Sequence, residues 1–259
     1  MLDCFPPLFP RTDQLEFRGE LLRQWGELLL SQTTGEGNQA DTDQPEGLRQ
    51  LRAAGLAFEQ LAELRFATKS YTDDLWRSAE NYFRGHSFSR AICQLDKYLN
   101  NEVELRNGEA LLRLGQAHLA LGRITESTAA FQECIEFHPK DSATYQARID
   151  CAKAYWHQGN VKKAEQLLRE NIAGSTLLPN SREWKDSLFE LGMLLHETGQ
   201  YEQAILKLEE AVERYPQDSQ SLMAQYKIGE SYRQSAEELL NKIPTAHTQS
   251  EQDKVQQQA

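Results

Sequence analysis

Apolar residues recur at intervals of three and four positions along most of the chain, which is the spacing of amphipathic helices. From residue 72 to residue 242 these stripes come in pairs, and the pairs recur every 36 to 40 residues. A glycine stands between the two stripes of several pairs, at Gly122, Gly159 and Gly199. Glycine readily adopts the left-handed conformation that ends a helix. The pattern therefore predicts an all-α chain built from pairs of helices joined by short turns.

Small residues occupy matching positions in successive pairs, where they would let a neighbouring helix approach closely. In the first stripes these residues are Ala79, Gly115, Ala152, Gly192 and Gly229. In the second stripes a small residue stands four positions before a large one, in the pairs Ala91 and Leu95, Ser127 and Phe131, Ala164 and Leu168, and Ala204 and Leu208. Pro139 and Pro216 follow two of the second stripes, and proline cannot continue a helix.

The two clearest units read LGxxHxxxGxIxxSxxxFxxCIxxxP from Leu114 and LGxxLxxxGxYxxAxxxLxxAVxxxP from Leu191. This pattern resembles the tetratricopeptide repeat, a degenerate motif with a period of about 34 residues. The resemblance implies a right-handed α-solenoid of antiparallel helix pairs. The implied repeats occupy about 72–107, 108–141, 145–181 and 185–218, with a partial repeat over 222–242, so the repeat array runs over 72–242.

Residues 1–70 are less regular. The pattern predicts a helix over 13–31 with Asp13 as its N-cap, a flexible polar loop over 31–46, and a second helix over 47–68. This region is either a degenerate first repeat whose turn is lengthened by the loop or an unrelated capping hairpin.

The C-terminal residues 243–259 are polar and rich in glutamine, which predicts a disordered tail. The repeat pattern stops in the middle of a unit, because no glycine turn follows Tyr232. A lengthened capping helix and a fragment of a longer array are both open interpretations.

The chain has 259 residues and a formal net charge of −11, which disfavours binding to nucleic acid. No apolar run is long enough to span a bilayer, and the N-terminus does not read as a signal peptide, so we expect a cytoplasmic protein without membrane insertion. The cysteines Cys4, Cys93, Cys134 and Cys151 lack the spacing of a zinc site or a disulfide framework.

The sequence offers little chemistry for catalysis. His196-Glu197 begins like a zinc-protease motif, but a second histidine does not follow four residues after the first. Phosphate-binding, dinucleotide-binding and nucleophile-elbow motifs are also absent from the sequence. We therefore expect no enzymatic activity, no catalytic residues, no metal and no cofactor.

A surface is the better functional candidate. In the family that the chain resembles, the first helices of the repeats line a concave groove that binds peptides. The positions that match this groove are Trp76, Phe83, Leu112, Gln116, Leu119, Ile149, Lys153, Trp156, Phe189, Met193, His196 and Arg233. Some of these residues could instead pack against the next helix. We expect Phe83, Trp156, Met193 and His196 to be the most exposed.

One subclass of the family grips the C-terminal carboxylate of its peptide with Lys, Asn and Arg at fixed positions, and this sequence does not match that clamp. The resemblance therefore implies a non-catalytic scaffold that binds a peptide or helix segment of a protein partner. An alternative is a regulatory or interaction fragment of a larger multidomain protein. A variant of this alternative is an envelope-assembly protein, because the stretch from Ala224 to Tyr232 is similar to repeats of outer-membrane assembly lipoproteins.

Overall fold

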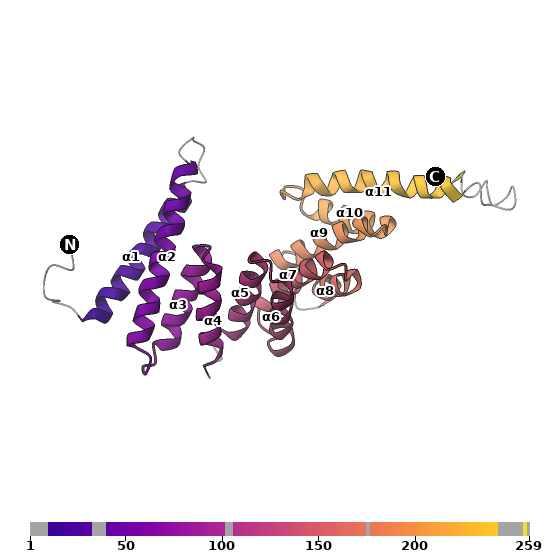
Figure 1. Ribbon diagram of the computed structural model, residues 1–259. Coiled ribbons are helices and arrows are strands. Elements are labelled where there is room, and N and C mark those ends of the chain that lie inside the picture. The colour runs from indigo at the N-terminus through magenta and orange to yellow at the C-terminus, as the bar shows by residue number, and fades with distance from the viewer. Residues whose placement is uncertain (1–9, 33–39, 102–105, 175–176, 243–255, 258–259) are drawn as a thin grey trace. The chain divides into compact units, whose positions relative to one another are not determined.

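The computed structural model describes residues 10–32, 40–101, 106–174, 177–242 and 256–257. Within these residues the regular structure is entirely helical, and consecutive helices run in opposite directions (Figure 1). The helices are α1 (Arg11–Gln32), α2 (Ala40–Leu64), α3 (Tyr71–Arg84), α4 (Phe88–Leu99), α5 (Asn107–Ala120), α6 (Ile124–Phe137), α7 (Ala143–His157), α8 (Val161–Ala173), α9 (Arg182–Glu197), α10 (Tyr201–Arg214) and α11 (Ser221–Lys242). The predicted all-α fold of antiparallel helix pairs is confirmed.

The chain forms two compact units that divide inside α7, after Ala147. In the first unit each helix from α1 to α5 packs against the next one along the chain. Two apolar clusters hold this unit together. One consists of Leu15, Ala54, Phe58 and Leu61, and the other of Ala62, Leu75, Trp76, Ala79, Leu95, Tyr98 and Ala110.

The second unit has the same construction. Helix α9 packs against α8 and α10, and α11 packs against both α10 and α9. The core between these helices consists of Trp184, Leu188, Phe189, Leu208, Ala211 and Ala224. The Trp184 indole N–H donates a hydrogen bond to the carbonyl of Ile172 over 3.2 Å, so the one polar atom of this ring is satisfied at the end of α8.

Two glycines of the first helices lie where their own second helix crosses. A Cβ atom at Gly115 would overlap the ring of Phe131, and one at Gly192 would overlap the side chain of Leu208. The three turn glycines serve another purpose. Gly122, Gly159 and Gly199 have φ of 71°, 77° and 76°, and the space around their Cα atoms is open. Backbone conformation explains the turn glycines, whereas close helix packing explains the other two.

The structure corrects the expected N-terminal boundaries. Helix α1 begins at Arg11, so Asp13 lies in its first turn and is not the N-cap. Helix α2 begins at Ala40, so residues 40–46 of the expected loop are helical. Gly47 packs against Gly26 and Leu30 near the end of α1, so α2 already contacts α1 at the residue where the hydrophobic pattern has this helix begin.

The remainder of the expected loop, residues 33–39, lies outside the described residues. So does the expected tail over 243–255 and 258–259.

Alanine substitutions at Gly192 and Gly229 should have opposite effects on stability. A methyl group at Gly192 collides with Leu208, so Gly192→Ala should lower the free energy of unfolding by about 1–3 kcal/mol. A methyl group at Gly229 meets no atom within 4 Å, so Gly229→Ala should raise it by about 0.5–1 kcal/mol through its better helix propensity. Urea unfolding followed by circular dichroism measures both, and equal effects would contradict the packing.

Asp74 should make stability depend on pH. Burial raises the pKa of this carboxyl to about 6, although Arg65 lies 3.6 Å away. The unfolded state releases this proton near pH 4, whereas the folded state keeps it up to about pH 6. The free energy of unfolding should therefore fall as the pH rises from about 4 to about 6, and it should remain at the lower value above about pH 6. Asp74→Asn should then be more stable than wild type at pH 7, by up to about 3 kcal/mol. The exposed neighbour serves as control, since Asp73→Asn should change little. A less stable Asp74→Asn at pH 7 would show that the Arg65 ion pair outweighs burial.

Candidate functional site

Packing divides the twelve expected groove residues into two sets. Five side chains are buried, namely Trp76, Leu112, Ile149, Phe189 and His196. Six are partly exposed, namely Phe83, Gln116, Leu119, Lys153, Trp156 and Met193, and Arg233 is exposed. Because the chain forms two separate units, the two parts of this surface are described one at a time.

The buried set belongs to the cores of the units. The ring of Trp76 lies 5.8 Å from that of Tyr98 between centroids, and the ring of Phe189 lies 6.2 Å from that of Tyr215. These contacts lie within the apolar clusters that join neighbouring helices. A side chain that packs there cannot offer its surface to a ligand.

His196 was expected to be exposed, and that prediction is wrong. Its ring is 8% exposed, and Nδ1 lies 2.9 Å from the hydroxyl oxygen of Ser231 on α11. Burial lowers the pKa of this imidazole, which favours the neutral form. The histidine therefore joins α9 to α11 as a hydrogen-bonded core residue.

In the first unit, two of the remaining groove residues, Phe83 and Gln116, contact Arg113 of α5. Its guanidinium group donates to Glu80 of α3 over 3.0 Å and to the Gln116 amide oxygen over 3.0 Å. The same group lies 5.1 Å from the centroid of the Phe83 ring. Phe83 in turn contacts Phe88 edge to face, with centroids 5.5 Å apart. This surface presents an aromatic ring beside a charge that is already paired.

In the second unit, a corresponding surface lies on α7 and α9. Lys153 of α7 forms an ion pair with Glu190 of α9 over 2.7 Å. Trp156 and Met193 each stand three residues after a member of this pair, so each lies one helical turn further on the same face. Both side chains are partly exposed. The result is a polar pair followed by an aromatic and a thioether side chain.

The two ion pairs occupy the same register with their charges exchanged. Glu80 and Lys153 directly follow the small residues Ala79 and Ala152 of their helices. Their partners, Arg113 and Glu190, each stand two residues before the glycine of the next first helix. In each unit, an ion pair at the same repeat position thus joins two neighbouring first helices. Repeat alignment could have located these positions, but only the fold shows which charges meet.

Sequence reasoning missed an extensive charge network between α1 and α3. Arg77 contacts Glu16 over 3.3 Å and Glu20 over 3.4 Å, and Arg84 contacts Glu27. Glu16 is also 2.8 Å from Arg65, which follows α2. These ion pairs occupy the surface that the first helices of this unit would offer to a ligand.

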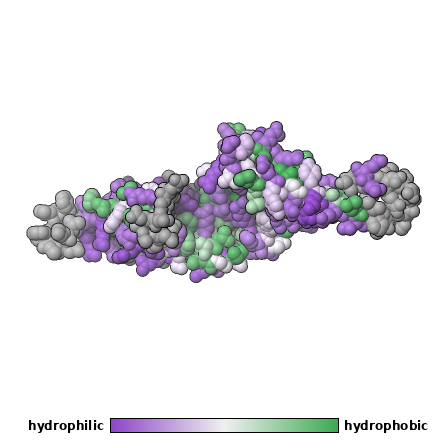
Figure 2. Space-filling model, turned by 90° about the horizontal axis from the view of Figure 1, so that it is seen from above, coloured by the Kyte–Doolittle hydropathy of each residue, from purple (hydrophilic) through white to green (hydrophobic). Residues whose placement is uncertain are grey.

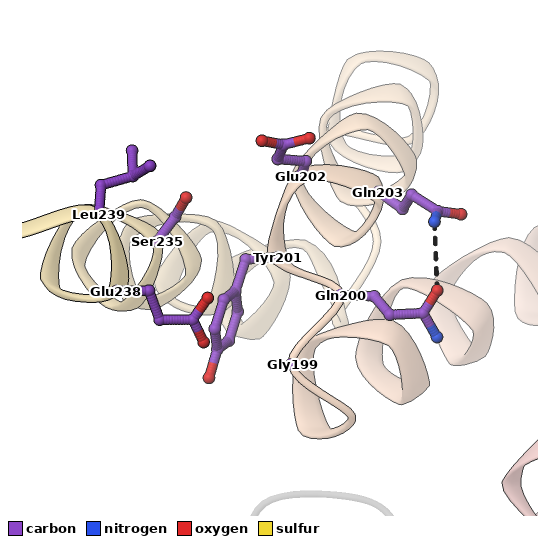
Figure 3. A pocket seen from close by; sticks show the side chains of 8 residues that line it. All are labelled: Gly199, Gln200, Tyr201, Glu202, Gln203, Ser235, Glu238 and Leu239. Atoms are coloured by element: carbon purple, nitrogen blue, oxygen red, sulfur yellow. Dashed lines mark hydrogen bonds between the residues drawn. The ribbon is translucent and has the colours of Figure 1, made fainter. Parts of the chain in front are cut away.

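A polar pocket between α10 and α11 was also not predicted. It is lined by Gly199, Gln200, Tyr201, Glu202, Gln203, Ser235, Glu238 and Leu239. Figure 3 shows the Tyr201 ring beside the carboxylate of Glu238, with Gln203 donating a hydrogen bond to Gln200 over 3.1 Å. Two carboxylates give this pocket an acidic character that suits a cationic side chain better than an anion.

The described surface carries apolar patches separated by polar regions, as the face in Figure 2 shows. Among the described residues, none of the helices is both long and apolar enough to cross a membrane. The same residues contain no cluster of three or more His, Cys, Asp or Glu side chains that could hold a metal ion.

Comparison with known proteins supports the repeat assignment. Three family models described as tetratricopeptide repeat match residues 109–141, 145–170 and 186–218. No curated protein sequence matches the chain.

Among solved structures, a tetratricopeptide repeat protein from Parabacteroides merdae is 13% identical, with a TM-score of 0.57 over 90% of this chain and 84% of that one. The MamA protein is 18% identical, with a TM-score of 0.54 over 73% of this chain and 87% of that one. YrrB, described as a TPR protein with an unusual peptide-binding site, is also 18% identical, with a TM-score of 0.54 over 70% and 86% of the two chains.

Such identities establish the fold alone, which is the predicted α-solenoid class. The helix pairs, the glycine crossings and the three matched segments lead to one assignment. The chain is a tetratricopeptide repeat protein.

Proposed function

We propose that the chain is a non-catalytic interaction scaffold that binds a peptide or helix segment of a protein partner on the first-helix face of its repeats. The observation that carries this proposal is the partial exposure of Phe83, Trp156 and Met193 on that face, while the neighbouring apolar positions are buried. Large side chains left open beside a packed core are typical of interaction sites.

The second unit offers the better binding surface. Trp156 and Met193 supply an aromatic ring and a polarisable, adaptable side chain, and both kinds are enriched where proteins bind one another. The Lys153–Glu190 ion pair next to them is partly exposed, so its outer atoms can still accept and donate hydrogen bonds. An apolar segment with polar groups at one end fits this combination.

The first unit offers a smaller surface around Phe83. Arg113 lies over this ring and is held by Glu80, so the guanidinium group adds little net charge. Leu119 and Gln116 are also partly exposed on α5. This surface favours an apolar side chain over a carboxylate, in agreement with the missing carboxylate clamp.

The peptide-binding site named for YrrB belongs to that protein, and it supports the proposal only by showing that this fold can carry one. We place the partner among apolar or amphipathic segments because the open side chains are apolar.

The test begins with peptides selected from a displayed library on the purified full-length chain. Binding of the selected peptides is then measured by fluorescence anisotropy. Replacing Trp156 or Met193 by Glu places a charge in the apolar contact, so each change should weaken binding at least about tenfold. Leu206→Glu, at a more exposed apolar residue on α10, should leave affinity unchanged.

Circular dichroism must show the same helix content in all variants. A selection without binders would overturn the proposal. So would binders that retain full affinity for both the Trp156→Glu and the Met193→Glu proteins.

A further inference from the structure

The first helix, α1, carries a stripe of large apolar side chains on its outer surface. Phe17 is 64% exposed, Leu21 49%, Trp25 46% and Leu28 56%. Their spacing of four, four and three residues places them on one side of the helix. The side that packs on α2 is a different one, formed by Leu15, Gly19 and Gly26. We refer to Phe17, Leu21, Trp25 and Leu28 as the α1 stripe.

The repeat register shows what this surface is built to contact. Trp25 stands directly before Gly26, as Ser78 stands before Ala79 in α3 and Leu191 before Gly192 in α9. Ser78 is fully buried, and its hydroxyl donates to the carbonyl of Gly55 on the preceding helix α2 over 2.9 Å. The position of Trp25 therefore faces the preceding second helix wherever a repeat has one.

The positions of Leu21 and Leu28 follow the same rule. The residue that matches Leu21 in α9 is Ser187, which is buried and accepts a hydrogen bond from Asn171 of the preceding helix α8 over 3.0 Å. The residue that matches Leu28 is Leu194, which is 1% exposed. A helix covers these positions in the inner repeats, so the α1 stripe has the form of a helix-binding surface.

The charges around the stripe allow two copies of this acidic chain to meet. The stripe itself contains no charged group. On the adjacent side of α1, Glu20 and Glu27 are both paired with arginines, and the exposed Asp13 stands at one end of the stripe, one turn before Phe17. Burying the stripe against another copy therefore removes apolar surface from water without bringing free carboxylates together.

The stripe is also complementary to itself. If two α1 helices pack antiparallel about a two-fold axis near residue 23, Phe17 of one lies against Leu28 of the other, and Leu21 lies against Trp25. A contact of this kind is isologous, since the same surface serves both copies. The exposed Arg18 would then lie about 14 Å from its symmetry mate along the helix axis, at about 1.5 Å per residue, so it does not oppose the contact.

We propose that the α1 stripe is a two-fold interface through which two copies of this chain associate. Each copy then supplies a helix that covers the stripe of the other. One helix pair forms a small interface, so we expect dissociation in the micromolar range. The proposal is independent of peptide binding on the first-helix face, because it uses other residues.

Sedimentation velocity of the full chain from about 1 to about 200 μM tests the proposal, a range chosen to bracket micromolar dissociation. Wild type should shift from monomer to dimer over this range. The Leu21→Glu/Trp25→Glu and Leu21→Lys/Trp25→Lys proteins should each remain monomeric, because like charges then meet in the contact. Mixed in equal amounts they should form a dimer, because each acidic position then faces a basic one. Leu21 and Trp25 are both exposed in the monomer, so circular dichroism should confirm unchanged helix content.

Leu206→Glu is the matched control, since it changes an exposed leucine of α10. The Leu206→Glu protein should dimerise as wild type does. A wild-type chain that stays monomeric throughout overturns the proposal, whether its stripe is covered by residues 1–9 or by nothing. A dimer that survives in the Leu21→Glu/Trp25→Glu protein overturns it as well, because the contact then lies elsewhere.

Discussion

Each repeat of this protein depends on the close approach of two helices at one small residue. Gly115 lies directly under Phe131, and Gly192 lies directly under Leu208. Because glycine has no side chain, the large residue of the second helix fills the space against the backbone of the first. This contact sets the register of the pair, and the register decides which side of each helix is buried.

The same register also determines what the other sides of the first helices contact. One side faces the preceding second helix, where Ser78 and Ser187 form hydrogen bonds across the contact. Another side faces the neighbouring first helix, where ion pairs such as Arg113–Glu80 and Lys153–Glu190 join successive repeats. Partly exposed ion pairs of this kind add little stability, so their main effect is on the character of the surface. Only a narrow strip of each first helix remains for a ligand.

That strip is narrower than the hydrophobic pattern alone indicates. Trp76 and Phe189 lie at positions that match a ligand groove, yet both belong to apolar clusters between helices. Phe83, Trp156 and Met193 remain partly open. The α1 stripe shows the opposite case. The positions of Leu21, Trp25 and Leu28 are covered by a preceding helix in inner repeats, whereas these three side chains are exposed on α1. The same register thus explains both why expected binding residues are buried and why unexpected ones are exposed.

The sequence by itself determined the repeat: the helix pairs, the left-handed turns at Gly122, Gly159 and Gly199, and the glycines under large side chains. These features are local or recur at a fixed period, so the spacing of residue types is sufficient to predict them. The early start of α2, the burial of His196 against Ser231 and the partners of Arg77 and Arg113 were decided only by the tertiary structure. Each depends on which side chain of another helix comes within reach. An apolar residue on a first helix has the same spacing whether a neighbour covers it or not, and only the packed helices decide which of the two occurs.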